Sequence, residues 1–406
     1  MSNIIDNIDN ILAGYLTKKD FLEYNNLISN KSVVEKQYRK SLKKSKAGYS
    51  EWYYYLTKIE LLISFAKRKL KKDKLFDMLF HLGDAALNRG EFGEAEKLFL
   101  YVISEVKGIP AFQEVEANTY LSLSVVYNKY TYWQKSLKYI KLARKIYMMN
   151  NNKKGIKHCD NLIGTIEAEK GNLKKAKAHF AKNLLNNNHG NDGSFNGVLE
   201  MNLGNLNTIQ GDFDTALAFY KKSLVKFKHN GDKSKIADVE HNIGMLYTQK
   251  GEDGNALKAF NRSISLSLDS GNLSTLGLSY LQKAYILTRL KNFTLAGDLL
   301  KKSMRICTNL NDQLSIADIY KIKGIIEREL KNFKAAENYL LASIKKNQAL
   351  ENKLNEAESN FELGLLYSKI GNQVKARRAF ILAYDYFESI GSGYMIKKIS
   401  EYLNLN

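Results

Sequence analysis

Proline is almost absent from this chain. There is one in 406 residues, where average usage near 5% would give roughly twenty. Sheet-and-turn folds with many proline corners are therefore disfavoured. Cysteine is also scarce, because Cys159 and Cys307 are the only two and cannot form a disulfide framework in a chain of this length. A reducing cytoplasm is the expected location.

Long apolar runs and acidic residues are lacking too. No run reaches the roughly 18 apolar residues that a membrane span needs, and Asp6 and Asp9 interrupt the N-terminal apolar stretch, so no signal peptide is expected. The 42 Asp and Glu against 62 Lys and Arg leave a net charge of +20. A hydrophobic content of 44% excludes a disordered chain. At this length the chain either divides into domains or extends as an array.

Motifs of catalysis and metal binding are missing. The sequence holds no phosphate-binding Gly-x-x-x-x-Gly-Lys-Ser/Thr, no Gly-x-Gly-x-x-Gly and no Gly-x-Ser-x-Gly. The six histidines are scattered, and His158 beside Cys159 points to a different face of a helix, so no metal site is predicted. We therefore expect a protein that is not an enzyme and needs no cofactor or metal.

A repeat of 40 residues runs through most of the chain. A small residue recurs at this spacing, a second small residue follows twelve positions later, and a large residue follows four positions after that. The first class is Gly83, Ser124, Gly164, Gly204, Gly244, Ala284, Gly324 and Gly364, with one step of 41 at the start. The second is Ala95, Ser136, Ala176, Ala216, Ala256, Ala296, Ala336 and Ala376, and the third is Phe99, Ile140, Phe180, Tyr220, Phe260, Leu300, Leu340 and Phe380. Three classes in register predict eight structural units.

Each unit is expected to form two helices. In one unit, apolar residues at spacings of three and four predict helices over 236–249 and 255–268. Gly251 between them is suited to the left-handed conformation that ends a helix. Three other units carry Tyr130, Lys291 or Lys331 at this turn. The large residue is expected to pack against the next unit, so that stacked pairs bury a continuous core.

Three sequence blocks resemble the tetratricopeptide-repeat family. They are Asn202-Leu203-Gly204, Tyr247 to Gly251, and Gly211 to Tyr220, which are similar to the first helix, the turn and the second helix of that family. The period is 40 residues instead of 34, and the proline that commonly closes a unit is missing. The longer period resembles a subclass of bacterial peptide-responsive regulators and of scaffolds with an Asn-Leu-Gly-Asn motif, which Asn202 to Asn205 reproduces. The resemblance implies an all-α fold, a right-handed superhelical solenoid of helix-turn-helix repeats.

The repeats are predicted over 76–390, with a different segment at each end. Residues 1–75 are expected to form a divergent, basic helical N-terminal cap, with a capping box at Ser32 and Glu35 and a helix over 51–70. Residues 391–406 are expected to form a C-terminal capping helix that covers the last unit with Tyr394, Ile399 and Leu403.

The resemblance also implies a concave groove lined by the first helix of each unit. The groove positions are His158, Asn161, Thr165, Met201, Asn202, Asn205, His241, Asn242, Met245, Thr248, Gln282, Tyr285 and Arg289. Asparagine both donates and accepts hydrogen bonds, so such a ladder suits the backbone of an extended peptide. The alternative is a solvated face in an asparagine-rich chain. Family members that clamp a terminal carboxylate carry groove lysines and an arginine where this chain has Met201, Asp238 and Gln282. We expect one long, open face instead of an enclosed pocket.

A basic patch is predicted near the N-terminus. It comprises Lys36, Arg39, Lys40, Lys43, Lys44, Lys67, Arg68 and Lys69. One interpretation is a solvated lysine face, and the other is contact with phosphates or with an acidic protein.

The favoured function is a non-catalytic scaffold or adaptor whose groove binds a protein or peptide segment. One alternative is a basic nucleic-acid-associated protein, whose affinity would fall steeply with salt. Another is a peptide-responsive bacterial regulator of the aspartyl-phosphate phosphatase type. The sequence does not predict the oligomeric state.

Overall fold

The described part of the protein consists of helices joined by short turns. The computed structural model describes residues 11–42, 51–185 and 193–403, with side chains outside 37–42, 51–58, 89 and 185, and this part contains no strand. It divides into two compact units, which are treated separately below. Unit 1 is 1–128 with 134–159, and unit 2 is 129–133 with 160–406. The boundaries predicted at 75 and 390 stay a prediction.

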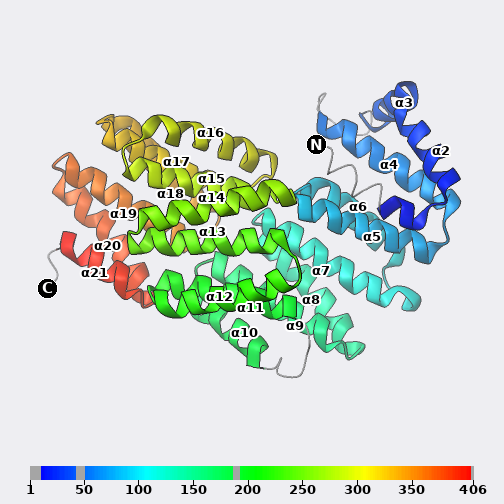
Figure 1. Ribbon diagram of the computed structural model, residues 1–406, viewed down its shortest axis with the longest axis horizontal. Helices are drawn as coiled ribbons and strands as arrows, with labels where there is room; N and C mark the ends of the chain where they lie inside the picture. The colour runs from blue at the N-terminus through cyan, green and yellow to red at the C-terminus, as the bar shows by residue number, and fades with distance from the viewer. Residues whose placement is uncertain (1–10, 43–50, 186–192, 404–406) are drawn as a thin grey trace. The chain divides into compact units, whose positions relative to one another are not determined.

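Unit 1 holds the N-terminal helices and the first repeats (Figure 1). Its core joins Tyr24, Phe65, Phe76 and Met78, all nearly inaccessible to solvent, so the N-terminal helices share a core with the first repeat. Its helices are α2 (Lys18–Ser29), α3 (Lys31–Leu42), α4 (Glu51–Lys69), α5 (Lys72–Arg89), α6 (Phe92–Val106), α7 (Gln113–Lys129), α8 (Trp133–Met149) and the start of α9 (Lys153–Glu169), whose remainder belongs to unit 2, with a 3-10 turn at Pro110–Phe112.

The predicted start of one helix in unit 1 is wrong. Helix α3 begins at Lys31, and the Asn30 side chain accepts a hydrogen bond from the Val33 amide at 3.4 Å. Asn30 therefore occupies the capping position that the sequence pattern assigned to Ser32, because an Asx side chain caps a helix as well as serine does. The helix predicted over 51–70 agrees with α4.

Unit 2 continues the array of helix pairs to the C-terminus. The helices predicted over 236–249 and 255–268 are confirmed and each is a few residues longer than predicted. The helices of unit 2 are α10 (Leu173–Leu185), α11 (Gly193–Gln210), α12 (Phe213–His229), α13 (Lys233–Lys250), α14 (Asp253–Ser270), α15 (Leu273–Arg289), α16 (Phe293–Asn309), α17 (Gln313–Glu329), α18 (Phe333–Ala349), α19 (Lys353–Lys369), α20 (Gln373–Ser389) and α21 (Gly393–Leu403).

The two helices of a pair meet where a glycine faces a large side chain. A Cβ atom added at Gly244 in α13 would lie 2.5 Å from Cε1 of Phe260 in α14, whose side chain is fully buried. The large residue thus fills the space above the glycine of its own pair. The sequence had predicted only a contact between this residue and the next unit. Phe260 also shares a cluster with Ile286 of the next pair. The same approach occurs at Gly83–Phe99, Gly164–Phe180, Gly204–Tyr220, Gly324–Leu340 and Gly364–Phe380.

The turn inside each pair needs a left-handed residue. Gly251 has φ of 78°, as expected for a glycine that ends a helix. Lys291 and Lys331 adopt φ of 59° and 65° at the equivalent turns despite their side chains. In a further unit the left-handed residue is Thr131 instead of Tyr130, with φ of 62°.

The last helices of unit 2 return to its first helices (Figure 1). The Tyr386 hydroxyl donates to the Gly171 carbonyl oxygen at 3.1 Å, and the Ser392 hydroxyl donates to the carbonyl oxygen of Ile209 at 3.0 Å. Lys170 also pairs with Glu351 at 2.7 Å. The right-handed superhelix therefore closes on itself, so the expectation of one long, open face is wrong for unit 2.

Helix α21 makes part of this closure. Ile399 and Leu403 are buried against the last pair, as predicted for a capping helix. Tyr394 instead lies against the opposite end of the unit, with its ring centroid 5.9 Å from that of Phe213. The reason is that the turn before α21 contacts the turn between α11 and α12. The sequence pattern of the C-terminal segment contains no sign of this contact.

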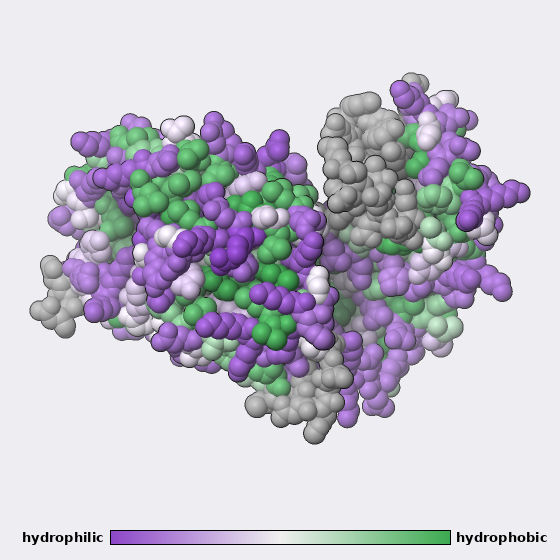
Figure 2. Space-filling model, viewed as in Figure 1, coloured by the Kyte–Doolittle hydropathy of each residue, from purple (hydrophilic) through white to green (hydrophobic). Residues whose placement is uncertain are grey.

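The outer surface mixes polar and apolar residues. Figure 2 shows hydrophilic residues among scattered hydrophobic ones on the viewed face of unit 2, a distribution that is ordinary for protein surfaces. Among the helices that the structure describes, none has the length and apolar character to cross a membrane.

The glycine contact yields a stability prediction. Gly244→Ala should lower the free energy of unfolding by about 1–3 kcal/mol, because the added methyl group overlaps a buried ring that has no room to move. Gly254→Ala is the matched control, since nothing lies within 4 Å of its added Cβ on the neighbouring helix α14. The control should leave stability unchanged or raise it by about 0.5 kcal/mol. Urea denaturation measures both, and equal stabilities of the two variants would contradict the proposed packing.

Candidate functional site

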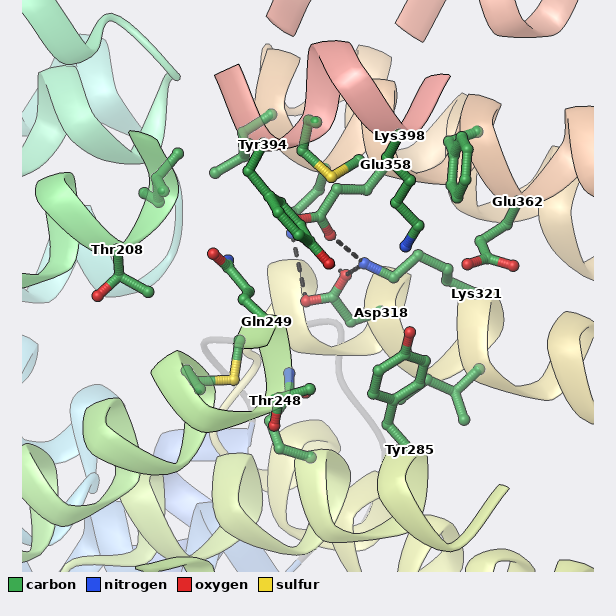
Figure 3. Close-up of a pocket in the computed structure, with 18 of the residues that line it drawn as sticks. Thr208, Thr248, Gln249, Tyr285, Asp318, Lys321, Glu358, Glu362, Tyr394 and Lys398 are labelled. Atoms are coloured by element: carbon green, nitrogen blue, oxygen red, sulfur yellow. Dashed lines mark hydrogen bonds and ion pairs between the residues drawn. The ribbon is translucent and has the colours of Figure 1, made fainter. Parts of the chain in front are cut away.

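A cavity of about 620 Å³ lies inside unit 2 (Figure 3). Its wall consists mainly of residues from α11, α13, α15, α17, α19 and α21. The first five are the first helices of successive pairs, the face that the resemblance assigns to ligand contact. The volume falls within the roughly 300–1,000 Å³ of pockets that bind small ligands. This cavity is the candidate site.

One position of the repeat recurs on each first helix along the cavity wall. Asn205, Met245, Tyr285, Ile325 and Leu365 stand 40 residues apart, and all five line the wall. The sequence period therefore brings one position of every first helix to the same inner surface. The side chain at that position changes from polar to apolar along the chain, so the wall is not uniform.

Many of the predicted groove residues line the cavity, and others do not. Those on the wall are Asn205, His241, Asn242, Met245, Thr248, Gln282, Tyr285 and Arg289. Asn161 and Asn202 are absent from it, and the Asn202 amide donates to the Asn161 amide oxygen at 3.2 Å. The Thr165 hydroxyl donates to the Asn161 carbonyl oxygen, and Met201 is buried in the helix core. His158 belongs to unit 1.

Neutral polar groups form the part of the wall made by α13 and α15. The His241 ring nitrogen Nδ1 lies 2.9 Å from the Ser279 hydroxyl oxygen. Burial lowers the pKa of His241 to about 4, so the imidazole is neutral at pH 7. Asn242, Gln249 and Gln282 line the same wall, and no hydrogen bond links their side chains to another residue in the described ranges. Their amides are available to a ligand.

Paired charges form the part of the wall made by α17 and α19. The Lys321 ammonium lies 3.0 Å from Asp318 Oδ1 and 2.5 Å from Glu358 Oε2 (Figure 3). Burial alone would lower the pKa of Lys321, but the two carboxylates outweigh it and raise that pKa, so the lysine stays charged. Burial raises the pKa of Asp318, and Lys321 opposes the rise. The Asn355 amide also donates to the Asp318 carboxylate at 3.3 Å.

Two arginines on the wall are also paired. Arg328 Nη1 lies 2.8 Å from Glu362 Oε2, and only 10% and 12% of the two side chains are exposed. Arg289 Nη1 lies 3.3 Å from Asp253 Oδ1 and donates to the Thr248 carbonyl oxygen. These cations are therefore held in place before any ligand binds.

Comparison with known proteins identifies the repeats. Residues 195–269 match the family model of the tetratricopeptide repeat. The chain contains tetratricopeptide repeats. No curated protein matches the sequence.

A solved structure shows the same fold at low identity. It is a Rap protein in complex with competence and sporulation factor, with 10% identity, coverage of 91% of this chain and 97% of that one, and a TM-score of 0.63. Another match is aspartyl phosphate phosphatase F from Bacillus subtilis, with 12% identity, coverage of 83% and 95%, and a TM-score of 0.44. The first supports the solenoid of tetratricopeptide repeats, and the second is too distant to support an argument.

The remaining wall residues were not predicted from the sequence. Asp318, Lys321, Glu358 and Glu362 lie on the first helices of the last two tetratricopeptide pairs, so extending the 40-residue register to 390 would have found them. Tyr394, Met395, Lys398 and Tyr402 lie on α21, outside the repeats. No repeat position indicates α21, because only the closure of unit 2 brings it to the cavity.

The predicted basic patch is partly neutralised within unit 1. Lys67 pairs with Glu105 at 3.1 Å, and Lys69 pairs with Asp20 at 2.9 Å and with Glu23 at 2.7 Å. Lys36 is exposed on α3, and the Arg68 guanidinium lies 5.9 Å from the centre of the Phe65 ring. The side chains of Arg39 and Lys40 and the whole of Lys43 and Lys44 lie outside the described part. Within the described ranges, no group of three or more His, Cys, Asp or Glu side chains is placed to hold a metal ion.

The buried histidine yields a pH prediction. Its folded-state pKa of about 4 lies below the ordinary 6.5. Between pH 4 and 6.5, His241 is therefore mostly protonated in the unfolded chain and mostly neutral in the folded protein. The stabilising effect is full above pH 6.5 and is lost as the pH falls towards 4. From pH 7 to 4.5, the wild type should lose about 2 kcal/mol more stability than His241→Gln. Denaturant titrations at both pH values test this, and parallel losses would show that His241 is not protected from protonation.

Proposed function

We propose that the protein is a non-catalytic scaffold that binds a short, extended peptide or protein segment in the cavity of unit 2. The observation that carries the proposal is a cavity of about 620 Å³ whose wall offers side-chain amides without internal partners in the described ranges. Amides of Asn and Gln both donate and accept, as the backbone of an extended chain does. A cavity of this size suits a few residues of a peptide and not a folded domain.

The state of the charged groups supports binding over catalysis. A general acid or base needs a side chain that is free to exchange a proton with a substrate. Here Asp318 and Glu358 share Lys321, and Glu362 is bound to Arg328. Paired groups of this kind fix the shape of the wall and the charge pattern that a ligand meets.

A known complex of the same fold is compatible with the proposal. The Rap protein with a TM-score of 0.63 was solved with competence and sporulation factor bound. At 10% identity this similarity concerns the fold alone. It supports a helical solenoid as a frame for a bound ligand, while the ligand class proposed for this chain rests on its own wall residues.

A peptide-responsive regulator is the second candidate function. The fold similarity to the Rap protein covers 91% of this chain, so it extends beyond the repeats to the N-terminal helices. A regulator of the aspartyl-phosphate phosphatase type would release phosphate from a phosphorylated receiver domain. Incubation of the full chain with such a domain tests this candidate, and a scaffold should leave the phosphate in place.

The amides of the neutral wall yield a binding prediction. Asn242→Ala combined with Gln282→Ala should weaken peptide binding by about 2 kcal/mol, or roughly thirtyfold in Kd, if each amide makes one hydrogen bond to the ligand. A random pentapeptide pool would be passed over the immobilised protein, and the retained peptides identified by mass spectrometry. The peptide most enriched would then be titrated by calorimetry.

Asn202→Ala is the control for this experiment. Its amide is bonded to Asn161 and does not line the cavity, so the variant should keep the affinity of the wild type. Retention of no pentapeptide by the wild type would reject the proposed function. Equal affinities of the wild type and the double variant would reject these two amides as ligand contacts.

A further inference from the structure

Helix α21 presents hydrogen-bond donors to the cavity from a fixed position. Tyr394, Lys398 and Tyr402 are four residues apart, so they lie on one face of the helix, and all three line the cavity. Ile399 and Leu403 of the same helix are buried in the core of unit 2. The donors are therefore carried by a helix that is anchored in the fold.

Lys398 differs from the other charged residues of the cavity wall. Each of those has an oppositely charged side chain within 4 Å, whereas Lys398 has none in the part of the chain that the structure describes. Its ammonium lies 5.0 Å from the centre of the Phe361 ring, and the side chain is half-buried. The pairs on the wall are Lys321 with Asp318 and Glu358, Arg328 with Glu362, and Arg289 with Asp253.

The groups that remain available on this side of the cavity are mainly donors. A lysine ammonium only donates hydrogen bonds, and a tyrosine hydroxyl donates one. The hydroxyl groups of Tyr285, Tyr394 and Tyr402 make no hydrogen bond within the described ranges. Figure 3 shows Tyr285, Tyr394 and Lys398 around the same hollow. A ligand that satisfies these donors must bring acceptor oxygens, and it must bring a negative charge to match Lys398.

We propose that Lys398 binds a carboxylate of the peptide ligand, with the hydroxyl groups of Tyr394 and Tyr402 as neighbouring donors. The proposal rests on the proposed function and names the chemistry of one ligand group. A carboxylate carries one charge, as Lys398 does, whereas a phosphate would bring about two into a wall that already holds Glu358 and Glu362. The tetratricopeptide positions that hold a terminal carboxylate in other members are Met201, Asp238 and Gln282 here, so this subsite belongs to α21 and not to the repeats.

The carboxylate has two sources, the C-terminus of the ligand and an Asp or Glu side chain. Three pools of random pentapeptides separate them, all acetylated at the N-terminus so that no terminal amine contributes. The first pool has a free C-terminal carboxylate and no Asp or Glu. The second is amidated at the C-terminus and contains one Glu at a random position. The third is amidated and contains no acidic residue.

Three variants isolate the contact from general electrostatics. Lys398→Met removes the charge at the cavity, and Lys397→Met removes the same charge from an exposed neighbour on α21 that does not line the cavity. Lys398→Arg keeps the cation and tests rescue by the conservative variant. Melting temperatures of all three establish that each is folded before its binding is compared.

The wild type should retain the first or the second pool about tenfold better than the third, as expected for a hydrogen bond to a charged group. Whichever acidic pool is preferred identifies the source of the carboxylate. Lys397→Met and Lys398→Arg should keep this preference, and Lys398→Met should lose it.

Equal retention of all three pools, or a preference that survives in folded Lys398→Met, would overturn the carboxylate subsite and leave the peptide-binding function standing. Retention of none of the pools would overturn the proposed function and the subsite with it.

Discussion

The contact between the two ends of unit 2 shapes the cavity that we propose as the binding site. Ser392 and Tyr386 donate to backbone carbonyl oxygens of Ile209 and Gly171, which precede them by 183 and 215 residues. Without these contacts the inner helices would form an open trough. With them the same helices surround a cavity whose wall includes both α11 and α21.

Helix pairs with a constant internal geometry make such closure feasible. The glycine of the first helix lets the large side chain of the second lie against its backbone, as Phe260 does at Gly244. Because the same contact recurs from pair to pair, each pair adds a similar step to the superhelix. The curvature is thus a sum of small, repeated steps, and a substitution at Gly244 acts through Phe260, which does not line the cavity.

The sequence predicted the parts of the site that the repeat encodes. Asn205, Met245 and Tyr285 were found because one register of a 40-residue period faces inward. Asn202 does not line the cavity, and its amide donates instead to Asn161 of the previous pair. Lys398 was missed because its place on the wall depends on closure between distant segments, and a periodic pattern contains no information about that contact. Local periodicity therefore predicts which face lines the cavity but not which groups on that face lack an internal partner.

The neutral part of the cavity wall, on α13 and α15, and the charged part, on α17 and α19, favour different groups of a ligand. An apolar group placed against Lys321 and its carboxylates would remove water from them without replacing its hydrogen bonds, which is unfavourable. The amides of Asn242 and Gln282 instead accept any chain that offers backbone donors and acceptors. In the proposed function, selectivity would come from exclusion at the charged wall and from Lys398, which has no oppositely charged partner on the wall among the described residues, since discrimination depends as much on penalising the wrong ligand as on contacts to the right one.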